Sequence, residues 1–355
     1  YGNGFSFHPH LLAKRMENNV TLPDDMMVEI LLKLRVKCLL RFKCVCKSWL
    51  SLISDPQFAK FHYDLGAGST HQLLKTHWET NSIDIEASLH DDSTRLVVKI
   101  PYPSPSHINA TINFVGSCRG FLLLITVSSD FVLYFMIWNP STGLRKRFNK
   151  VVPMLPYLYG IGYDASTDDY VVVMIRLGKE VHCFSLRSNS WSCIEGTAPL
   201  PYKPISNSFL NGSYLNGALH WLVYSNAYHF KIIAFDLVQR RLSEIPLPRH
   251  IRECTCYLNV MGGCLCLFST TFVPAQLWIM KEYKVQSSWT ATSVLDAPYG
   301  FRPICFTKNG EILGYNNGDK MLMRLTDRGQ LLEKRRSSCN KFVVYKESLL
   351  SLSPN

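Results

Sequence analysis

From about residue 70 onward, the sequence repeats one pattern of short apolar segments at intervals of 44 to 51 residues. The segments are rich in Val, Ile, Tyr, Phe and Trp, follow a period of two and are separated by Gly-containing turns, as in β-hairpins. Aligning them places five residues at equivalent positions: Trp138, Phe184, Phe235, Ile279 and Arg324. A period of about 40–50 residues with about four strands per repeat is typical of the blades of a β-propeller.

Five repeats are visible, and two further regions supply strands for another. Residues 71–112 contain strand-like segments, and the C-terminal segment FVVYKESLLSL can complete the first blade. Closing a ring in this way removes the exposed strand edges that an open sheet presents. We therefore predict an all-β, kelch-like propeller of about six blades, with five or seven blades left open.

The segment before the repeats has helical periodicity instead. Leu22-Pro23-Asp24-Asp25 suits the first turn of a helix, and an apolar face follows at Met26, Met27, Ile30, Leu31 and Leu34. A second apolar stripe is predicted to end at Ser54-Asp55-Pro56, and it comprises Leu39, Phe42, Val45, Cys46, Trp49, Leu52 and Ile53. Because a unit of about forty residues buries little core of its own, its two-sided apolar surface predicts a partner.

Three regions follow from this change of period. We expect residues 1–20 to be a disordered leader, with translation starting at Met16. Residues 21–62 form the small all-α domain, and residues 63–355 form the propeller.

The composition favours a folded chain in a reducing compartment. A hydrophobic content of 47% with 18% charged residues excludes a disordered chain. The net charge of +11 permits acidic partners, although the basic residues are spread along the sequence. The sequence contains no apolar stretch of membrane-spanning length and no recognisable secretory signal. Twelve cysteines in such a chain are expected to be reduced, which predicts a cytoplasmic and/or nuclear location and no membrane contact.

Residues that could carry chemistry have simpler structural explanations. The pairs Cys254/Cys256 and Cys264/Cys266 could hold zinc across a hairpin, but the same spacing is that of small buried residues on strands. Asp164, Asp168 and Asp169 are expected in a polar turn, and His220 in the core. We therefore predict no catalytic residues, no metal and no cofactor.

Two basic clusters raise the question of an acidic partner. They are Arg145-Lys146-Arg147 with Lys150, and Lys334-Arg335-Arg336. Solvated outer strands are the first interpretation, and docking of an acidic protein is the alternative. Nucleic-acid binding is not expected, since aromatic residues for base stacking are not interleaved with these charges.

Two parts of the sequence resemble one known family. Residues 22–58 resemble an F-box, through Leu-Pro, the apolar helix, RFKCVCKSW and ISDPQF. The repeats resemble the F-box-associated domain of plant F-box/kelch-repeat proteins, in the segments WNPSTG (138–143), GIGYD (160–164), TDDY (167–170), YLNGALHW (214–221), FDL (235–237), IPLP (245–248) and WIMKEY (278–283).

The resemblance implies a non-catalytic substrate-recognition subunit of a Skp–cullin–F-box ubiquitin ligase. The helical domain would bind a Skp-type adaptor and through it cullin, and the propeller would bind the unidentified protein to be ubiquitinated. By similarity, the adaptor contacts are Leu22, Pro23, Met26, Ile30, Leu31, Leu34, Leu39, Val45 and Trp49. The family usually has a proline where this chain has Arg35, and its absence is expected to weaken adaptor binding. A scaffold that acts outside any ligase and, less favoured, a propeller enzyme remain as alternatives.

Substrate contacts are expected on the longer loops between strands. These loops cover 102–107, 199–207, 225–230, 249–256 and 296–302, and they are richer in Pro, Tyr and Arg than the tight turns. The candidate residues are Tyr102, His107, Tyr202, Tyr228, Arg249, Arg252, Tyr299 and Arg302. The sequence leaves open which face of the propeller they share, which protein they bind and whether that protein must carry a phosphate or glycan.

Overall fold

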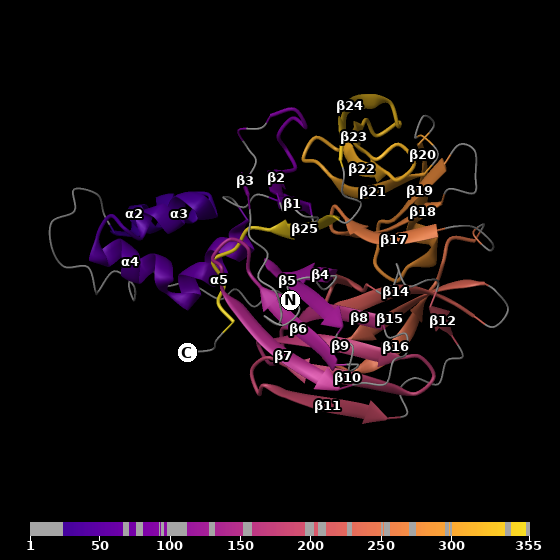
Figure 1. Cartoon of the computed structure of the whole chain (residues 1–355), viewed down its shortest axis with the longest axis horizontal. Coiled ribbons are helices and arrows are strands. Elements are labelled where there is room, and N and C mark those ends of the chain that lie inside the picture. Colours follow the sequence, from indigo (N-terminus) through magenta and orange to yellow (C-terminus); the bar gives the residue numbers. More distant parts are fainter. Residues whose placement is uncertain are drawn as a thin grey trace.

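The computed structural model of this chain describes residues 24–66, 71–75, 81–91, 93, 96–97, 112–127, 132–151, 158–195, 202–204, 211–225, 229–249, 251, 256–269, 275–294, 298, 300–337 and 342–352. Within these ranges, a group of helices precedes a series of antiparallel sheets. The helices lie beside the sheets as a separate layer (Figure 1).

The described part of the helical unit has four helices: α2 (Asp24–Leu32), α3 (Val36–Phe42), α4 (Lys47–Ser54) and α5 (Pro56–Leu65). The start of α5 is strongly determined by its sequence. The Asp55 carboxylate accepts hydrogen bonds from the backbone N–H groups of Gln57 (2.7 Å) and Phe58 (3.2 Å). Pro56 occupies the first helical position, and Gly66 ends the helix in the left-handed region at φ 66°.

The structure corrects one expectation about these helices and confirms another. The second apolar stripe is divided between α3 and α4, because Cys46 is extended and its sulfur accepts a hydrogen bond from the Trp49 N–H at 3.4 Å. The predicted end of the stripe at Ser54-Asp55-Pro56 is confirmed, since α4 ends at Ser54 and Pro56 starts the next helix, α5. A proline lacks only a backbone N–H that has no partner in the first turn, so it is tolerated there.

The strands that the structure describes form six antiparallel sheets, of which five consist of consecutive strands. The first of these five sheets has β4 (Asn113–Cys118), β5 (Phe121–Val127), β6 (Val132–Trp138) and β7 (Arg145–Val151), and the next has β8 (Leu158–Asp164), β9 (Asp169–Arg176), β10 (Glu180–Ser185) and β11 (Ser190–Glu195). The middle sheet has β12 (Lys203–Pro204), β13 (Ser213–Leu215), β14 (Ala218–Tyr224), β15 (Phe230–Asp236) and β16 (Arg241–Ile245). The last two are β17 (Cys256–Met261), β18 (Cys264–Ser269), β19 (Ala275–Met280) and β20 (Trp289–Val294), with a short helix η4 (Gln286–Ser288), and then β21 (Phe301–Phe306), β22 (Ile312–Asn316), β23 (Met321–Leu325) and β24 (Leu331–Arg336).

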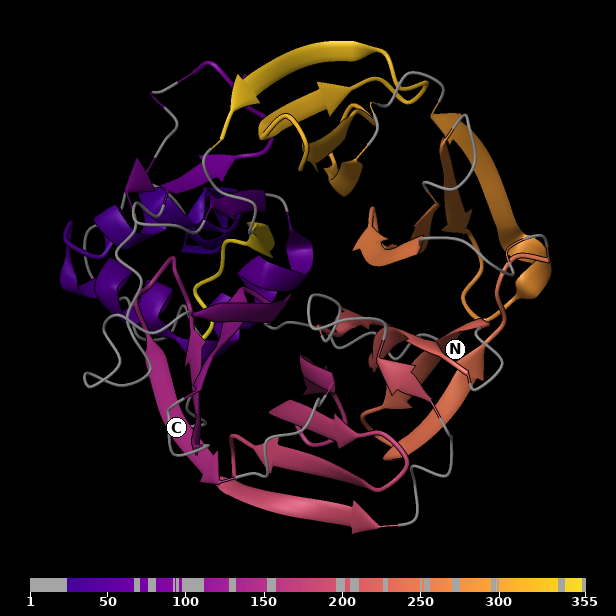
Figure 2. The same ribbon diagram turned by 45° about the vertical axis from the view of Figure 1, so that its right-hand side comes forward.

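The remaining sheet is composite and joins the two ends of the chain. It has the order β25 (Phe342–Lys346), β1 (His71–Lys75), β2 (Asn81–Asp84) and β3 (Leu96–Val97). β25 pairs with β1 from His71↔Lys346 to Lys75↔Phe342, which confirms that the C-terminal segment completes the first sheet. Figure 2 shows the resulting ring.

The aligned positions of the repeats coincide with one element of each sheet. Trp138, Phe184, Phe235, Ile279 and Arg324 all lie at or next to the end of the third strand. The fold is therefore a propeller, whereas the kelch-like character of its blades stays a prediction.

One continuous hydrophobic core joins the helices to the propeller. It includes Phe58 of α5, Phe121 of β5 and Leu350, which follows β25. The backbone after β25 is also held by Asn139, whose amide nitrogen donates to the carbonyls of Ser348 (3.0 Å) and Leu350 (3.3 Å). The two ends of the chain thus fix the helical unit against the ring.

Candidate functional site

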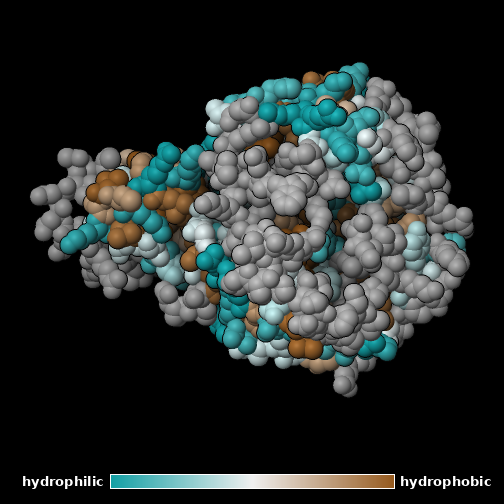
Figure 3. Space-filling model, in the orientation of Figure 1, coloured by the Kyte–Doolittle hydropathy of each residue, from teal (hydrophilic) through white to brown (hydrophobic). Residues whose placement is uncertain are grey.

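Apolar side chains are exposed on the helical unit. Met26 and Ile30 of α2 are 51% and 46% exposed, Val45 before α4 is 61% exposed, and Leu50 of α4 is 47% exposed. Figure 3 shows hydrophobic surface over the helices, next to the propeller. Large apolar side chains exposed at this density on a small helical unit indicate a surface that a partner covers.

Only part of the predicted adaptor surface is available to a partner. Leu31 and Leu39 are 1% and 0% exposed, so we correct the prediction that these two side chains contact an adaptor; they support the helices from inside. Leu34 and Trp49 are partly buried, and Leu22 and Pro23 lie outside the described residues. The sequence analysis missed Leu50, although its spacing of four residues from Cys46 and three from Ile53 places it on the same stripe.

Arg119, in the β4–β5 turn, connects the helices to the propeller. Its guanidinium lies over the rings of Tyr63 from α5 (4.8 Å) and Tyr163 from β8 (4.5 Å), and it donates to the Asp64 carboxylate at 3.1 Å. Burial raises the pKa of both tyrosines to about 12, so they face the guanidinium as neutral rings near pH 7. This arrangement combines two cation–π contacts with an ion pair.

Further contacts surround Arg119. The Lys346 ammonium donates to the Tyr63 carbonyl at 2.7 Å and lies 4.1 Å from the centre of the Tyr63 ring. Two ion pairs lie farther out, Lys60–Asp168 (3.9 Å) and Arg35–Asp84 (3.6 Å). Exposed pairs of this kind contribute little stability, so the orientation of the helices rests mainly on the shared core and on Arg119.

Among the described residues, the polar contacts between the helices and the propeller lie on one face of the propeller. We call this the helix face; it holds the turns at 119–120 and 165–168 and the end of β2, where Arg119, Asp168 and Asp84 contact Asp64, Lys60 and Arg35 of the helical unit. Because antiparallel neighbours run in opposite directions, successive connections alternate between the two ends of a sheet. The five candidate loops all connect strand ends at the opposite end, which we call the distal face.

The candidate loop residues differ in their exposure to solvent, and several lie outside the described residues. Tyr202 is only 9% exposed and its hydroxyl donates to Glu244, so it is a structural residue and its prediction as a substrate contact is corrected. Arg249 is exposed, and exposed Arg302 lies 4.6 Å from the centre of the Tyr257 ring. Tyr102, His107, Tyr228, Arg252 and Tyr299 lie outside the described residues.

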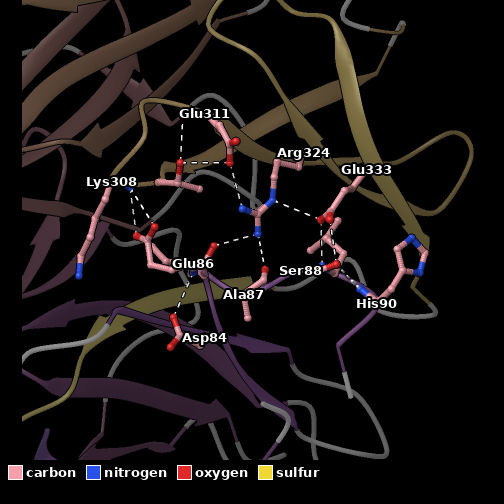
Figure 4. A network of polar contacts seen from close by, with 12 residues as sticks. Asp84, Glu86, Ala87, Ser88, His90, Lys308, Glu311, Arg324 and Glu333 are labelled. Carbon is pink, nitrogen blue, oxygen red and sulfur yellow. Dashed lines mark hydrogen bonds and ion pairs between the residues drawn. The ribbon is translucent and has the colours of Figure 1, made fainter. Parts of the chain in front are cut away.

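The cluster of charged groups around Arg324 is structural (Figure 4). Arg324 of β23 is 7% exposed and donates to Glu311 (3.0 Å) and to the carbonyls of Ile85 (3.0 Å) and Ala87. Glu333 lies 3.5 Å from the same guanidinium. Every carboxylate is thus engaged, and the cluster ties the backbone after β2 to the last sheet of the ring.

Hydrogen bonds also explain why the carboxylate of Glu333 is partly buried in this cluster. It accepts from the Ser88 hydroxyl (2.8 Å) and the Leu89 N–H (2.9 Å). Burial alone would raise the pKa of Glu333, but these bonds and the Arg324 charge hold it below the usual value. A carboxyl kept ionised and fully engaged is not suited to act as a general acid.

The other candidate groups are explained by local structure. Asp164 accepts from the Ser166 N–H (3.0 Å) and pairs with Arg240 (3.1 Å), as the turn interpretation predicts. The expected hairpin exists between β17 and β18, but Cys256 lies opposite Ser269 and Cys264 opposite Met261. These two cysteines are therefore at opposite ends of the hairpin, which speaks against a shared zinc ion; Cys254 lies outside the described residues.

Glu180, His182 and Cys193 form one group of possible metal ligands, with ligand atoms within 4.8 Å of one another. Two cations adjoin it. Arg176 lies 3.7 Å from Glu180, and the charge of Lys150 adds to burial in lowering the pKa of His182. Positive neighbours oppose the binding of a dication. We therefore interpret the group as an ion-pair cluster between the β4–β7 sheet and the β8–β11 sheet.

Both basic clusters lie on outermost strands, as predicted. β7 carries Arg145 and Arg147 and β24 carries Lys334 and Arg336, all exposed. None of the helices described is long and apolar enough to cross a membrane.

Comparison with known proteins finds both domains. Residues 21–61 match the F-box domain, and residues 71–344 match the F-box associated beta propeller domain. An F-box/kelch-repeat protein of Arabidopsis thaliana is 31% identical over 309 residues, which cover 78% of this chain and 80% of that protein. The F-box protein CPR1 of the same plant is 27% identical over 346 residues, covering 84% of this chain and 80% of CPR1.

Among solved structures, TolB from Acinetobacter baumannii is similar in fold. It superposes with a TM-score of 0.50 at 10% sequence identity, covering 79% of this chain and 67% of TolB. At this identity the similarity concerns the propeller fold alone.

Proposed function

Because this chain belongs to the plant F-box protein family that carries an F-box-associated β-propeller domain, we propose that it is a substrate-recognition subunit of a Skp–cullin–F-box ubiquitin ligase. Its F-box binds a Skp-type adaptor and through it cullin. Its propeller holds the protein to be ubiquitinated. The work of such a subunit is proximity, which raises the effective concentration of the substrate at the ubiquitin donor and needs no catalytic residue of its own.

The observation that carries this proposal is the exposed apolar surface of the helices. Met26, Ile30, Val45 and Leu50 stay exposed although the helical unit already shares a core with the propeller. Intramolecular packing therefore does not account for them. An adaptor that buries these side chains gains the free energy of their desolvation.

The junction around Arg119 supports the same mechanism. Since the helices are fixed on the helix face, an adaptor bound to them holds the distal face at one orientation. A rigid connection keeps a bound substrate at a constant distance from the ligase, which maximises the effective concentration.

Charged substitutions in α2 test adaptor binding. We expect Met26→Asp/Ile30→Asp to weaken binding of a Skp adaptor by about tenfold or more, because two carboxylates would be desolvated in the interface. The measurement is a pull-down of purified adaptor, followed by titration of its affinity.

The matched control is Val238→Asp, which changes a 53% exposed apolar side chain in the β15–β16 turn. It should bind the adaptor as the wild type does. Failure of the wild type to bind would refute the ligase assignment and favour the ligase-independent scaffold, and unchanged binding by the α2 variant would show that another surface is used.

Arg35 gives a second prediction about the helical unit. Its φ of −65° already fits a proline ring, and no described group accepts a hydrogen bond from its N–H. Arg35→Pro should therefore raise the free energy of unfolding by about 0.4–1 kcal/mol, by restricting the unfolded chain. Urea denaturation checks this, and a fall in stability would mean that Leu34 cannot adopt the conformation that a following proline requires.

We further place the protein in the cytoplasm or nucleus, where ubiquitin ligases of this type would act. Ten cysteines lie in the described ranges and all have free thiols, which is compatible with a reducing compartment. Zinc analysis of the purified protein addresses the enzyme alternative, which requires a bound metal or a catalytic group.

A further inference from the structure

We propose that a groove along β23 and β24 docks an extended acidic segment of the partner protein, one that alternates carboxylates with apolar side chains. This inference deepens the proposed function by naming the chemistry of the substrate segment. The groove has a volume of about 650 Å³ and is lined by Pro298, Asp319, Met321, Met323, Leu331, Lys334 and Arg336.

The groove reaches the face that the helices leave free. The β21–β22 turn lies at the helix face, where the Lys308 N–H donates to Glu86 at 3.1 Å. By alternation, the β22–β23 turn with Asp319 lies at the distal face, together with Met321 and Arg336 at the adjacent strand ends. A protein docked there would not collide with an adaptor on the helices.

The walls of the groove combine apolar and basic side chains in register. Met321 lies opposite Arg336 and Met323 opposite Lys334, so the four side chains share one side of the sheet. Leu331, 47% exposed, extends the apolar surface toward the helix face. Unbranched methionines adapt to differently shaped apolar partners.

The charges of the groove favour a negative partner. Lys334 and Arg336 are exposed, and neither forms an ion pair with another described side chain. The single carboxylate in the lining, Asp319, leaves a net positive charge. Among the described strands, β24 is also the outermost strand of its sheet, a position at which an extended segment can add to a sheet.

A binding assay on the full chain tests this proposal. The probe is a short fluorescent peptide of alternating Glu and Leu, and its control replaces Glu by Gln. The wild type should bind the acidic peptide about tenfold more tightly than the control, and Lys334→Glu/Arg336→Glu should remove this preference.

The matched variant is Arg145→Glu/Arg147→Glu, which makes the same charge change on the outer strand β7. It should alter peptide affinity by less than about twofold. Equal weakening in both double variants would overturn the proposal, because it would show attraction to net charge alone. The proposal would also be overturned if the wild type did not bind the peptide, or if it bound an oligouridine probe more tightly than the peptide.

An adaptor pull-down on the same samples separates this proposal from the receptor role. The Lys334→Glu/Arg336→Glu variant should bind a Skp adaptor like the wild type, since the groove lies away from the helices. If the wild type binds the adaptor and not the peptide, the groove assignment falls while the receptor role stands.

Discussion

Replacing Arg324 by Met should lower the free energy of unfolding by about 3 kcal/mol or more. The guanidinium is buried and serves two carboxylates, Glu311 and Glu333, and two backbone carbonyls, those of Ile85 and Ala87. Methionine fills much of the same volume but donates no hydrogen bond. The variant therefore leaves the two carbonyls without this donor and removes the positive charge beside Glu311 and Glu333, and such groups are costly when removed from water.

The position of Arg324 makes the effect global. Its partners Ile85 and Ala87 follow β2 in the composite sheet, while Arg324 lies in the last sheet of consecutive strands. The network therefore secures the closure of the ring next to the β25–β1 pairing. Losing it frees the strand edges that closure protects, so we also expect the variant to aggregate more readily on heating.

Urea denaturation followed by tryptophan fluorescence measures this loss. The control is Arg328→Met, an exposed arginine in the β23–β24 turn, for which we expect a change within about 0.5 kcal/mol. Similar losses in the two variants would contradict the closure role of Arg324. Arg324→Lys should recover only part of the stability, because an ammonium cannot reach both carbonyls and both carboxylates.

The second large effect is a loss of stability in acid that depends on His220. This residue is fully buried: its Nδ1 donates to the Ser213 carbonyl (3.0 Å), and its Nε2 accepts from the Tyr283 hydroxyl (2.7 Å). Burial, together with the nearby charge of Lys284, lowers the pKa of His220 to about 4. The neutral ring thus has a partner at each nitrogen, and burial disfavours the charged ring.

The direction of the pH effect follows from this pKa. In the unfolded chain, His220 has a pKa near 6.5, so it takes up a proton there before it does so in the folded protein. Its contribution is therefore complete above about pH 6.5 and is lost as the pH falls toward 4, to a total of about 3 kcal/mol. Over this range, the unfolded state gains the proton and the folded state does not.

Comparison of two histidine variants isolates this contribution from that of the carboxylates. His220→Gln cannot titrate, yet its amide can donate to Ser213 and accept from Tyr283, so its stability should fall less between pH 6.5 and 4.5. His229→Gln, at an exposed histidine, is the matched control for the substitution itself. Parallel curves for the wild type and His220→Gln would show that His220 does not control the acid response.

Local patterns were sufficient to predict the order of elements. A period of two with Gly turns specifies hairpins, and the recurrence of Trp138, Phe184, Phe235 and Ile279 specifies that the hairpins form equivalent units. The period of the helical segment likewise separates it from the propeller. The sequence analysis missed the boundary between helices α3 and α4, because an apolar stripe can continue across two helices that share one core.

Exposure on the helices could not be predicted in the same way. Ile30 and Leu31 are adjacent, apolar and part of the same stripe, yet one is 46% exposed and the other 1% exposed. Leu31 is buried in a core to which Leu349 and Leu350 also belong, and these two residues come some 320 residues later in the chain. The pattern of a helix shows that it has an apolar face, but not how wide a part of that face its neighbours cover.

The sequence by itself thus determined the helical unit, the propeller and their family, because these follow from periodicities within a few residues and from repeats along the chain. Only the tertiary structure decided that the candidate loops connect strand ends on the face away from the helices, and that Arg324, at a position otherwise apolar in the repeats, is satisfied by the backbone after β2. Both depend on which distant segments meet when the ring closes, and no local pattern of side chains carries that information.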